Sequence, residues 1–136
     1  MTAYVLDANV ISLVLRGDLA ARSHFRQALL ADSPILGCPV VWYEVHRGLL
    51  ARDAKGQMRR FEALFENFIW QDYTRADWTL AASLWTQRRG EGLPIGDADL
   101  LIGVFARNRN AVLVTDNEKD FAGLGITVQN WTLPET

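Results

Sequence analysis

Short apolar runs alternate with longer segments that carry apolar residues at helical spacing, and this alternation constrains the fold more than any other feature. The short runs predict strands at Ala3–Leu6, Ile35–Cys38, Ile69–Tyr73, Ala111–Thr115 and Ile126–Asn130. The longer segments predict helices at Ala8–Leu15, Ala20–Leu30, Val40–Arg52, Gln57–Phe68, Arg75–Arg89 and Ala98–Arg109, with a loop at Gly90–Gly96. Strands that alternate with helices favour an α/β fold with a parallel sheet covered by helices.

The length of 136 residues suits one domain, which we expect to span 1–136. Apolar residues make up 49% of the chain and charged residues 22%, which excludes a disordered chain, a disulfide mini-protein and a collagen-like fibre. Cys38 is the single cysteine, so no intrachain disulfide can form, and we expect a reducing, cytoplasmic location. The sequence predicts neither a membrane span nor a signal peptide.

The net charge of −2 argues against binding nucleic acid by bulk electrostatics. Twelve of the fourteen basic residues are arginine, however, and arginine suits bidentate contacts with phosphate. If several acids surround a cation, the remaining surface is net basic. The net charge therefore does not exclude a nucleic-acid substrate. The residues that either bind its phosphates or are simply solvated are Arg16, Arg47, Arg88 and Arg89.

Five acidic side chains interrupt the apolar elements. Asp7 closes the first predicted strand and Asp116 follows the fourth, while Asp97 and Asp99 open a predicted helix and Glu44 stands in an apolar stretch. In open parallel sheets, ligands bind beyond the carboxyl ends of the strands, so strand-end acids can face one crevice. A pocket of four carboxylates would repel itself, and a divalent cation is the usual remedy.

Each of these acids also has a structural explanation. Asp7, Asp97 and Asp99 are suited to cap helices, Glu44 to a solvated helix face, and Asp116 to a turn. If the acids do bind a metal, oxygen ligands favour Mg²⁺ or Mn²⁺ over zinc. We expect His24, His46 and Cys38 to be structural.

Four segments, in order, resemble the motifs of PIN-domain nucleases, and VapC-type toxins of toxin–antitoxin pairs are the best match within that family. The segments are Val5-Leu6-Asp7-Ala8-Asn9-Val10-Ile11, Val41-Trp42-Tyr43-Glu44-Val45, Pro94 to Gly103 with its Asp97-Ala98-Asp99, and Val112 to Phe121 with its Thr115-Asp116-Asn117. The closing Val128-Gln129-Asn130-Trp131 fits as well. The resemblance covers essentially the whole chain and implies an α/β/α sandwich with a five-stranded parallel sheet.

The resemblance also implies a site. Its metal-binding and catalytic residues would be Asp7, Glu44, Asp99 and Asp116, holding Mg²⁺ with Mn²⁺ able to substitute. Asn9 and Thr115 would orient these carboxylates. Asp97 has no firm counterpart in the family motif, and Asn117 and Asp120 compete with Asp116 for the fourth position.

The activity that the resemblance implies is metal-dependent endoribonuclease cleavage by a toxin. Such toxins are often homodimers, and a cognate VapB-type antitoxin inhibits them by covering the active-site groove. Two alternatives remain. One is a haloacid-dehalogenase-like phosphatase, for which Asn9 lacks the second carboxylate. The other is a catalytically silent, partner-binding PIN domain, and the five tryptophans make an apolar groove plausible.

Overall fold

The five strands within residues 1–134 are short and all parallel. A computed structural model describes residues 1–134, with strands β1 (Tyr4–Leu6), β2 (Leu36–Gly37), β3 (Ile69–Trp70), β4 (Val112–Val114) and β5 (Val128–Gln129). Strands β1, β4 and β5 form one parallel sheet in the order β1-β4-β5, and β2 pairs with β3. One parallel bridge between Tyr4 and Ile35 connects the two sheets.

The predicted α/β class and parallel pairing are confirmed, and the five-stranded sheet differs only in that its five parallel strands form two ladders joined by a single bridge. The strands divide into sheets of three and two. Proline explains the division, because Pro34 precedes β2 and Pro39 already begins the next helix, so few residues are left to form a ladder. The Tyr4 amide still donates to the Pro34 carbonyl at 2.9 Å, which keeps β1 beside β2.

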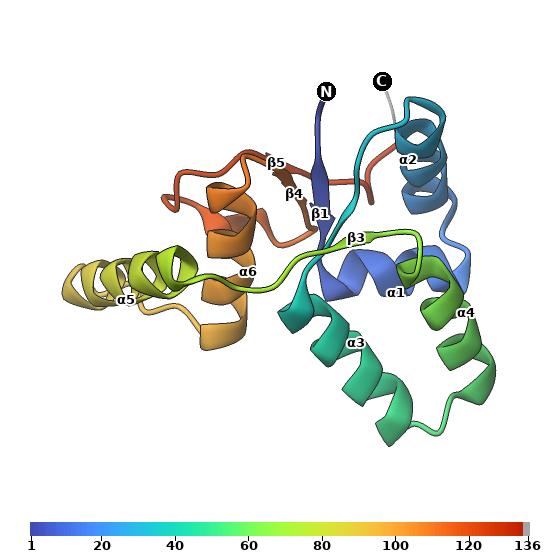
Figure 1. The fold of residues 1–136 in the computed structure, drawn as a ribbon, viewed down its shortest axis with the longest axis horizontal. Coiled ribbons are helices and arrows are strands. Elements are labelled where there is room, and N and C mark those ends of the chain that lie inside the picture. Colours follow the sequence, from blue (N-terminus) through green and yellow to red (C-terminus); the bar gives the residue numbers. More distant parts are fainter. Residues whose placement is uncertain (135–136) are drawn as a thin grey trace.

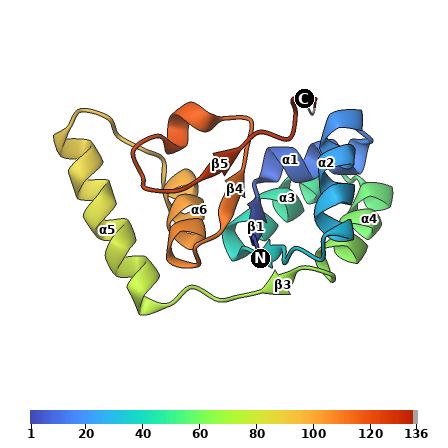
Figure 2. The same cartoon turned by 90° about the horizontal axis from the view of Figure 1, so that it is seen from above.

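Helices lie on both sides of the strands, as Figures 1 and 2 show. They are α1 (Ala8–Arg16), α2 (Leu19–Leu30), α3 (Pro39–Ala51), α4 (Lys55–Phe65), α5 (Arg75–Gly90), α6 (Asp97–Asn108) and a 3₁₀ turn, η1 (Glu118–Phe121). In Figure 2, α1 to α4 gather on one side of β1, and α6 and α5 lie on the other. Every predicted helix is present, although α4 ends at Phe65 rather than Phe68. None of the described helices is long and apolar enough to cross a membrane.

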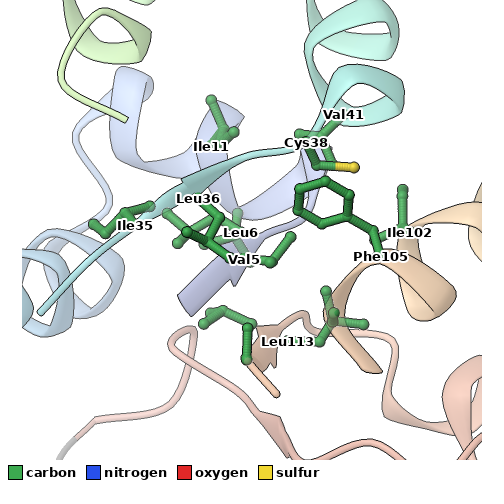
Figure 3. Packing of buried hydrophobic residues seen from close by; sticks show 14 of the residues in the cluster. Val5, Leu6, Ile11, Ile35, Leu36, Cys38, Val41, Ile102, Phe105 and Leu113 are labelled. Atoms are coloured by element: carbon green, nitrogen blue, oxygen red, sulfur yellow. The ribbon is translucent and has the colours of Figure 1, made fainter. Parts of the chain in front are cut away.

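The core forms around β1, whose residues Val5 and Leu6 are buried (Figure 3). Side chains from α1, α3 and α6 surround this strand, and Ile11, Val41 and Phe105 are fully buried among them. Burying an aliphatic or aromatic side chain contributes roughly 1.5–3 kcal/mol. The carboxyl end of β1, and Asp7 directly after it, is therefore attached to the best-packed part of the molecule.

Helix α5 lies farthest from the strands, and a buried ion pair fastens it to α6 (Figure 1). The Arg109 guanidinium donates to both carboxylate oxygens of Asp77 at 3.0 and 2.9 Å, and Asn108 donates to the same group at 2.8 Å. Thr74 and Asp77 also form a capping box at the start of α5. Burial acts to raise the pKa of Asp77, but the hydrogen bonds from Arg109, the Thr74 amide and Asn108 outweigh it and lower this pKa to about 2.

Replacing Asp77→Asn is expected to lower the free energy of unfolding by about 3–5 kcal/mol at pH 7, because it leaves the buried Arg109 charge without a carboxylate to balance it. The folded-state pKa of Asp77 lies below the ordinary value of 3.8, so its contribution is complete above about pH 5 and is lost progressively as the pH falls through 3.8 toward 2. Denaturant unfolding of both proteins at pH 7 and at low pH measures this. A difference that stays constant down to pH 2 would contradict it.

Candidate active site

Asp7 stands at the junction between β1 and α1. One carboxylate oxygen accepts a hydrogen bond from the Val10 amide at 2.9 Å, so Asp7 caps α1 as its structural explanation requires. The residue is only 8% exposed, and the Thr115 hydroxyl also hydrogen-bonds to it. The side chain is thus held in one orientation at the carboxyl end of the central strand.

The electrostatic environment of Asp7 disfavours its charge. Burial is the main cause, and repulsion from Asp116 and Asp99 adds to it, whereas the hydrogen bonds from Thr115 and Val10 act in the opposite direction. The net effect raises the pKa of Asp7 to about 6. The folded protein therefore retains an energetically costly carboxylate at neutral pH, and a nearby cation would relieve that cost.

Asp99 lies at the centre of the group of acids. It stands in the first turn of α6, where burial is the main cause that raises its pKa and repulsion from Asp120 is the second. Its charge also acts on Asp7 and on Glu44 of α3. Burial and then Asp99 raise the pKa of Glu44, while Arg47 lowers it through an ion pair of 3.8 Å. The structure thus brings acids from β1, α3 and α6 to one edge of the sheet.

Two acids from the segment after β4, rather than one, lie at this edge of the sheet. Asp116 repels Asp7, and it accepts a long 3.5 Å hydrogen bond from the Asn9 amide. Asp120 repels Asp99, and it accepts a hydrogen bond from the Asn117 side chain at 2.5 Å. The Thr115 hydroxyl accepts from the Asn117 backbone amide at 3.0 Å, which fixes the turn that carries both acids. The competing fourth-position residues therefore lie side by side and act on different partners. We use "acidic edge" for Asp7, Glu44, Asp99, Asp116 and Asp120.

Asp97 faces a different part of the surface. It lines a cavity of about 540 Å³ between α5 and α6, together with Trp78, Trp85 and Leu101. Asp99, two residues along the helix, interacts with the acidic edge instead. Asp97 and Asp99 therefore face different parts of the surface. Their difference follows from the helical geometry, since residues two apart point to different sides.

His24, His46 and Cys38 make structural contacts, as expected. The His24 ring stacks on Trp131, and the His46 ring stacks on Trp42 with centroids 4.4 Å apart. Cys38 is buried beside the Tyr73 hydroxyl at 3.3 Å, and burial raises the pKa of its thiol. These environments suit packing rather than metal binding or nucleophilic chemistry.

The acidic edge offers oxygen ligands but no closed cage. Within residues 1–134, no three His, Cys, Asp or Glu side chains are grouped closely enough to hold a metal ion between them. Mg²⁺ usually keeps several of its waters and is bound through one or two carboxylates, so it does not require such a cage. The all-oxygen donors and the mutual repulsion around Asp7 fit a hydrated Mg²⁺ or Mn²⁺ ion, with part of the contacts through water.

A second feature adjoins Glu44 and was only partly anticipated from the sequence. A cavity of about 200 Å³ lies between α1 and α3, and its polar lining includes Asn9, Ser12, Arg47 and Arg52. Asn9 and Arg47 are among the candidates predicted from the sequence, whereas Ser12 and Arg52 are not. Helical spacing was the available signal, because Ser12 lies one turn after Asn9 and Arg52 lies two turns after Glu44.

The family model of the PIN domain matches residues 4–126. The chain therefore belongs to the PIN-domain family. Among curated proteins it is similar to Ribonuclease VapC1 of Haemophilus influenzae, strain R2866, with 26% identity over 131 residues that cover 95% of this chain and 98% of the relative.

Solved structures show the same fold. VapBC2 from Rickettsia felis, bound to a DNA fragment from its promoter, matches with a TM-score of 0.86 and 21% identity over 96% of this chain and 99% of the matched chain. VapBC-1 from nontypeable Haemophilus influenzae matches with a TM-score of 0.84 and 24% identity over 97% and 100% of the two chains.

Proposed function

We propose that this chain is a metal-dependent endoribonuclease that acts as the toxin of a toxin–antitoxin pair. The observation that carries the proposal is the convergence of Asp7, Asp99 and Asp116 at the carboxyl ends of β1 and β4, where their charges act on one another. The position of such a site matches the general rule for open parallel sheets. Similarity to a curated ribonuclease over nearly the whole chain supports the same activity.

In this proposal, Asp7, Glu44, Asp99 and Asp116 hold Mg²⁺ or Mn²⁺, and Asp120 can assist through Asp99. When bound, such a cation supplies an activated water and neutralises charge that develops on the phosphate. Thr115 orients Asp7 by its hydrogen bond, and Asn9 does the same for Asp116. Attack by water needs no 2′-hydroxyl, so the products carry a 5′-phosphate and a 3′-hydroxyl.

The proposed partner is a VapB-type antitoxin. The two solved structures named above are VapBC assemblies, and VapBC2 is bound to a DNA fragment from its promoter. A homodimer of this chain is part of the same proposal. Under this proposal the exposed apolar surface around Trp78 is available to a protein partner, since that side chain is 52% exposed.

The phosphatase alternative gains no support from the structure. It requires a general acid two residues after Asp7, and Asn9 holds that position with its amide directed to Asp116. The silent-domain alternative predicts no cleavage at all. Incubating the purified, antitoxin-free protein with total RNA in Mg²⁺ or in EDTA, followed by end mapping, separates the hypotheses. We expect cleavage in Mg²⁺ alone, with 5′-phosphate ends. Intact RNA in both samples would contradict the proposed function.

Asp97→Asn is expected to reduce cleavage far less than Asp99→Asn does. Asp97 lines the α5–α6 cavity, whereas Asp99 interacts with three acids of the edge. Initial rates of RNA cleavage for the two variants, measured at equal protein concentration, test the assignment. An inactive Asp97→Asn protein beside an active Asp99→Asn protein would reverse it.

A further inference from the structure

The cavity between α1 and α3 differs from the acidic edge in the sign of its charge. Its lining includes two guanidinium groups, from Arg47 and Arg52, against one carboxylate, from Glu44. The Ser12 hydroxyl and the Asn9 amide add neutral hydrogen-bond donors. Donors of this kind, gathered in a hollow, suit an anionic group with several acceptor oxygens.

The two arginines keep most of their donors available. Arg47 lies over the Tyr43 ring at 4.8 Å and makes a side-chain hydrogen bond with Tyr43, and its ion pair with Glu44 is long, at 3.8 Å, with the arginine side chain 58% exposed. A pair of this kind contributes little energy, so the guanidinium can turn toward an anion. The Arg52 guanidinium has no hydrogen bond or ion pair to the part of the chain that the structure describes. Gly48 lies between the two arginines in the sequence and has no side chain that could fill the cavity. A Cβ at this position would lie 4.0 Å from the Arg52 Nη1 atom.

The cavity also shares residues with the acidic edge. Glu44 belongs to both, and Asn9 lines the cavity while its amide donates to Asp116. At about 30 Å³ per water, its volume of about 200 Å³ accommodates a tetrahedral phosphate with some of its waters. A group bound here lies next to whatever the acids bind.

The position of the arginine-lined cavity beside the acidic edge bears on how the protein can bind a polyanion. Five acids at one edge repel a polyanion, and a divalent cation offsets only part of their charge. Positive groups beside the acids would compensate for the rest. We propose that the α1–α3 cavity is a subsite in which Arg47 and Arg52 bind a backbone phosphate of single-stranded RNA, adjacent to the phosphodiester that is cleaved. This proposal rests on the proposed nuclease function.

Binding measured without cleavage tests the subsite. An Asp99→Asn background in EDTA is titrated against a short, fluorescein-labelled single-stranded RNA of mixed sequence, over a range of salt concentrations. Adding Arg47→Gln or Arg52→Gln is expected to weaken binding several-fold and to reduce the slope of log K against log salt by about 0.7 for each lost phosphate contact. Arg26→Gln, an exposed arginine of α2, is the matched control and is expected to change neither quantity.

A Mn²⁺ titration of the single Arg47→Gln variant shows whether the acidic edge is intact. This substitution removes the guanidinium charge that pairs with Glu44, so we expect the Mn²⁺ affinity to be unchanged or higher. Loss of Mn²⁺ binding, or an equal loss of RNA affinity in Arg26→Gln, would overturn the subsite. An unchanged salt slope in both cavity variants, beside wild-type protein that cleaves RNA, would refute the subsite alone. Wild-type protein that neither binds nor cleaves RNA would refute the proposed function as well.

Discussion

Asp7→Asn and Asp99→Asn are each expected to reduce metal-dependent RNA cleavage by on the order of a thousandfold or more. Each substitution replaces a charged oxygen ligand by a neutral amide of nearly the same volume. Asp7 is the most buried acid of the edge, and Asp99 interacts with Asp7, Glu44 and Asp120, so either loss weakens the whole group. Initial rates with total RNA in Mg²⁺ measure the effect.

The stability of Asp7→Asn provides the control for this experiment. An asparagine can still accept the Val10 amide and cap α1, while the cost of a buried charge disappears. A pKa raised from 3.8 to about 6 corresponds to roughly 3 kcal/mol, so the variant is expected to unfold at higher denaturant in EDTA at pH 7.5. Loss of activity then reflects the site and not the fold. Cleavage at the wild-type rate by either variant would contradict the site assignment.

Expression of the wild-type chain alone is expected to arrest growth of a bacterial host, and co-expression of its cognate antitoxin is expected to restore growth. The physical reason is that a site at strand ends is open to single-stranded RNA and is equally open to a polypeptide. An arginine of the partner can pair with the acids of the edge. Colony counts after induction, with and without the partner gene, measure the effect.

The apolar part of such an interface is available beside the site. Trp78 is 52% and Trp85 is 41% exposed, and they line the cavity between α5 and α6 together with Asp97. Buried aromatic side chains commonly supply most of the affinity of an interface. Trp42 is less available, because its ring stacks on His46 and packs edge-to-face against Trp70.

The Asp7→Asn chain is the control for toxicity. It lacks a charge of the acidic edge but retains the apolar surface of α5 and α6, so it is expected to be harmless and still to bind the antitoxin. Pull-down of the antitoxin by this variant completes the test. Equal growth inhibition by wild-type and Asp7→Asn chains would mean that toxicity comes from overexpression, and the toxin proposal would fail.

Local patterns sufficed to predict where the helices and strands lie and where Asp7 stands. An apolar run that ends at an acid is a strand end, and the structure places Asp7 there with Val5 and Leu6 buried before it. Alternating elements also predicted the parallel pairing. The prolines that shorten β2 are visible in the sequence, but the sequence does not show that β1 and β2 share only the Tyr4–Ile35 bridge.

Helical spacing predicted which residues share a face of a helix, but not which face is buried against the rest of the protein. On α5 the sequence places Trp78, Ala81, Ala82 and Trp85 at helical spacing, yet the buried residues are Asp77, Ala81 and Leu84. Asp77 is buried because it pairs with Arg109, which lies 32 residues away in the sequence and gives no local signal. The same limit applies to Asp120, whose interaction with Asp99 depends on the turn after β4 rather than on its own neighbours.

A calorimetric Mn²⁺ titration shows directly whether the acidic edge binds a divalent cation through Asp99. Wild-type protein, Asp99→Asn and Asp97→Asn are titrated in the same buffer after treatment with EDTA and its removal. We expect saturable binding to wild-type and Asp97→Asn protein and at least tenfold weaker binding to Asp99→Asn. Equal affinity in all three proteins, or no binding to the wild type, would contradict it.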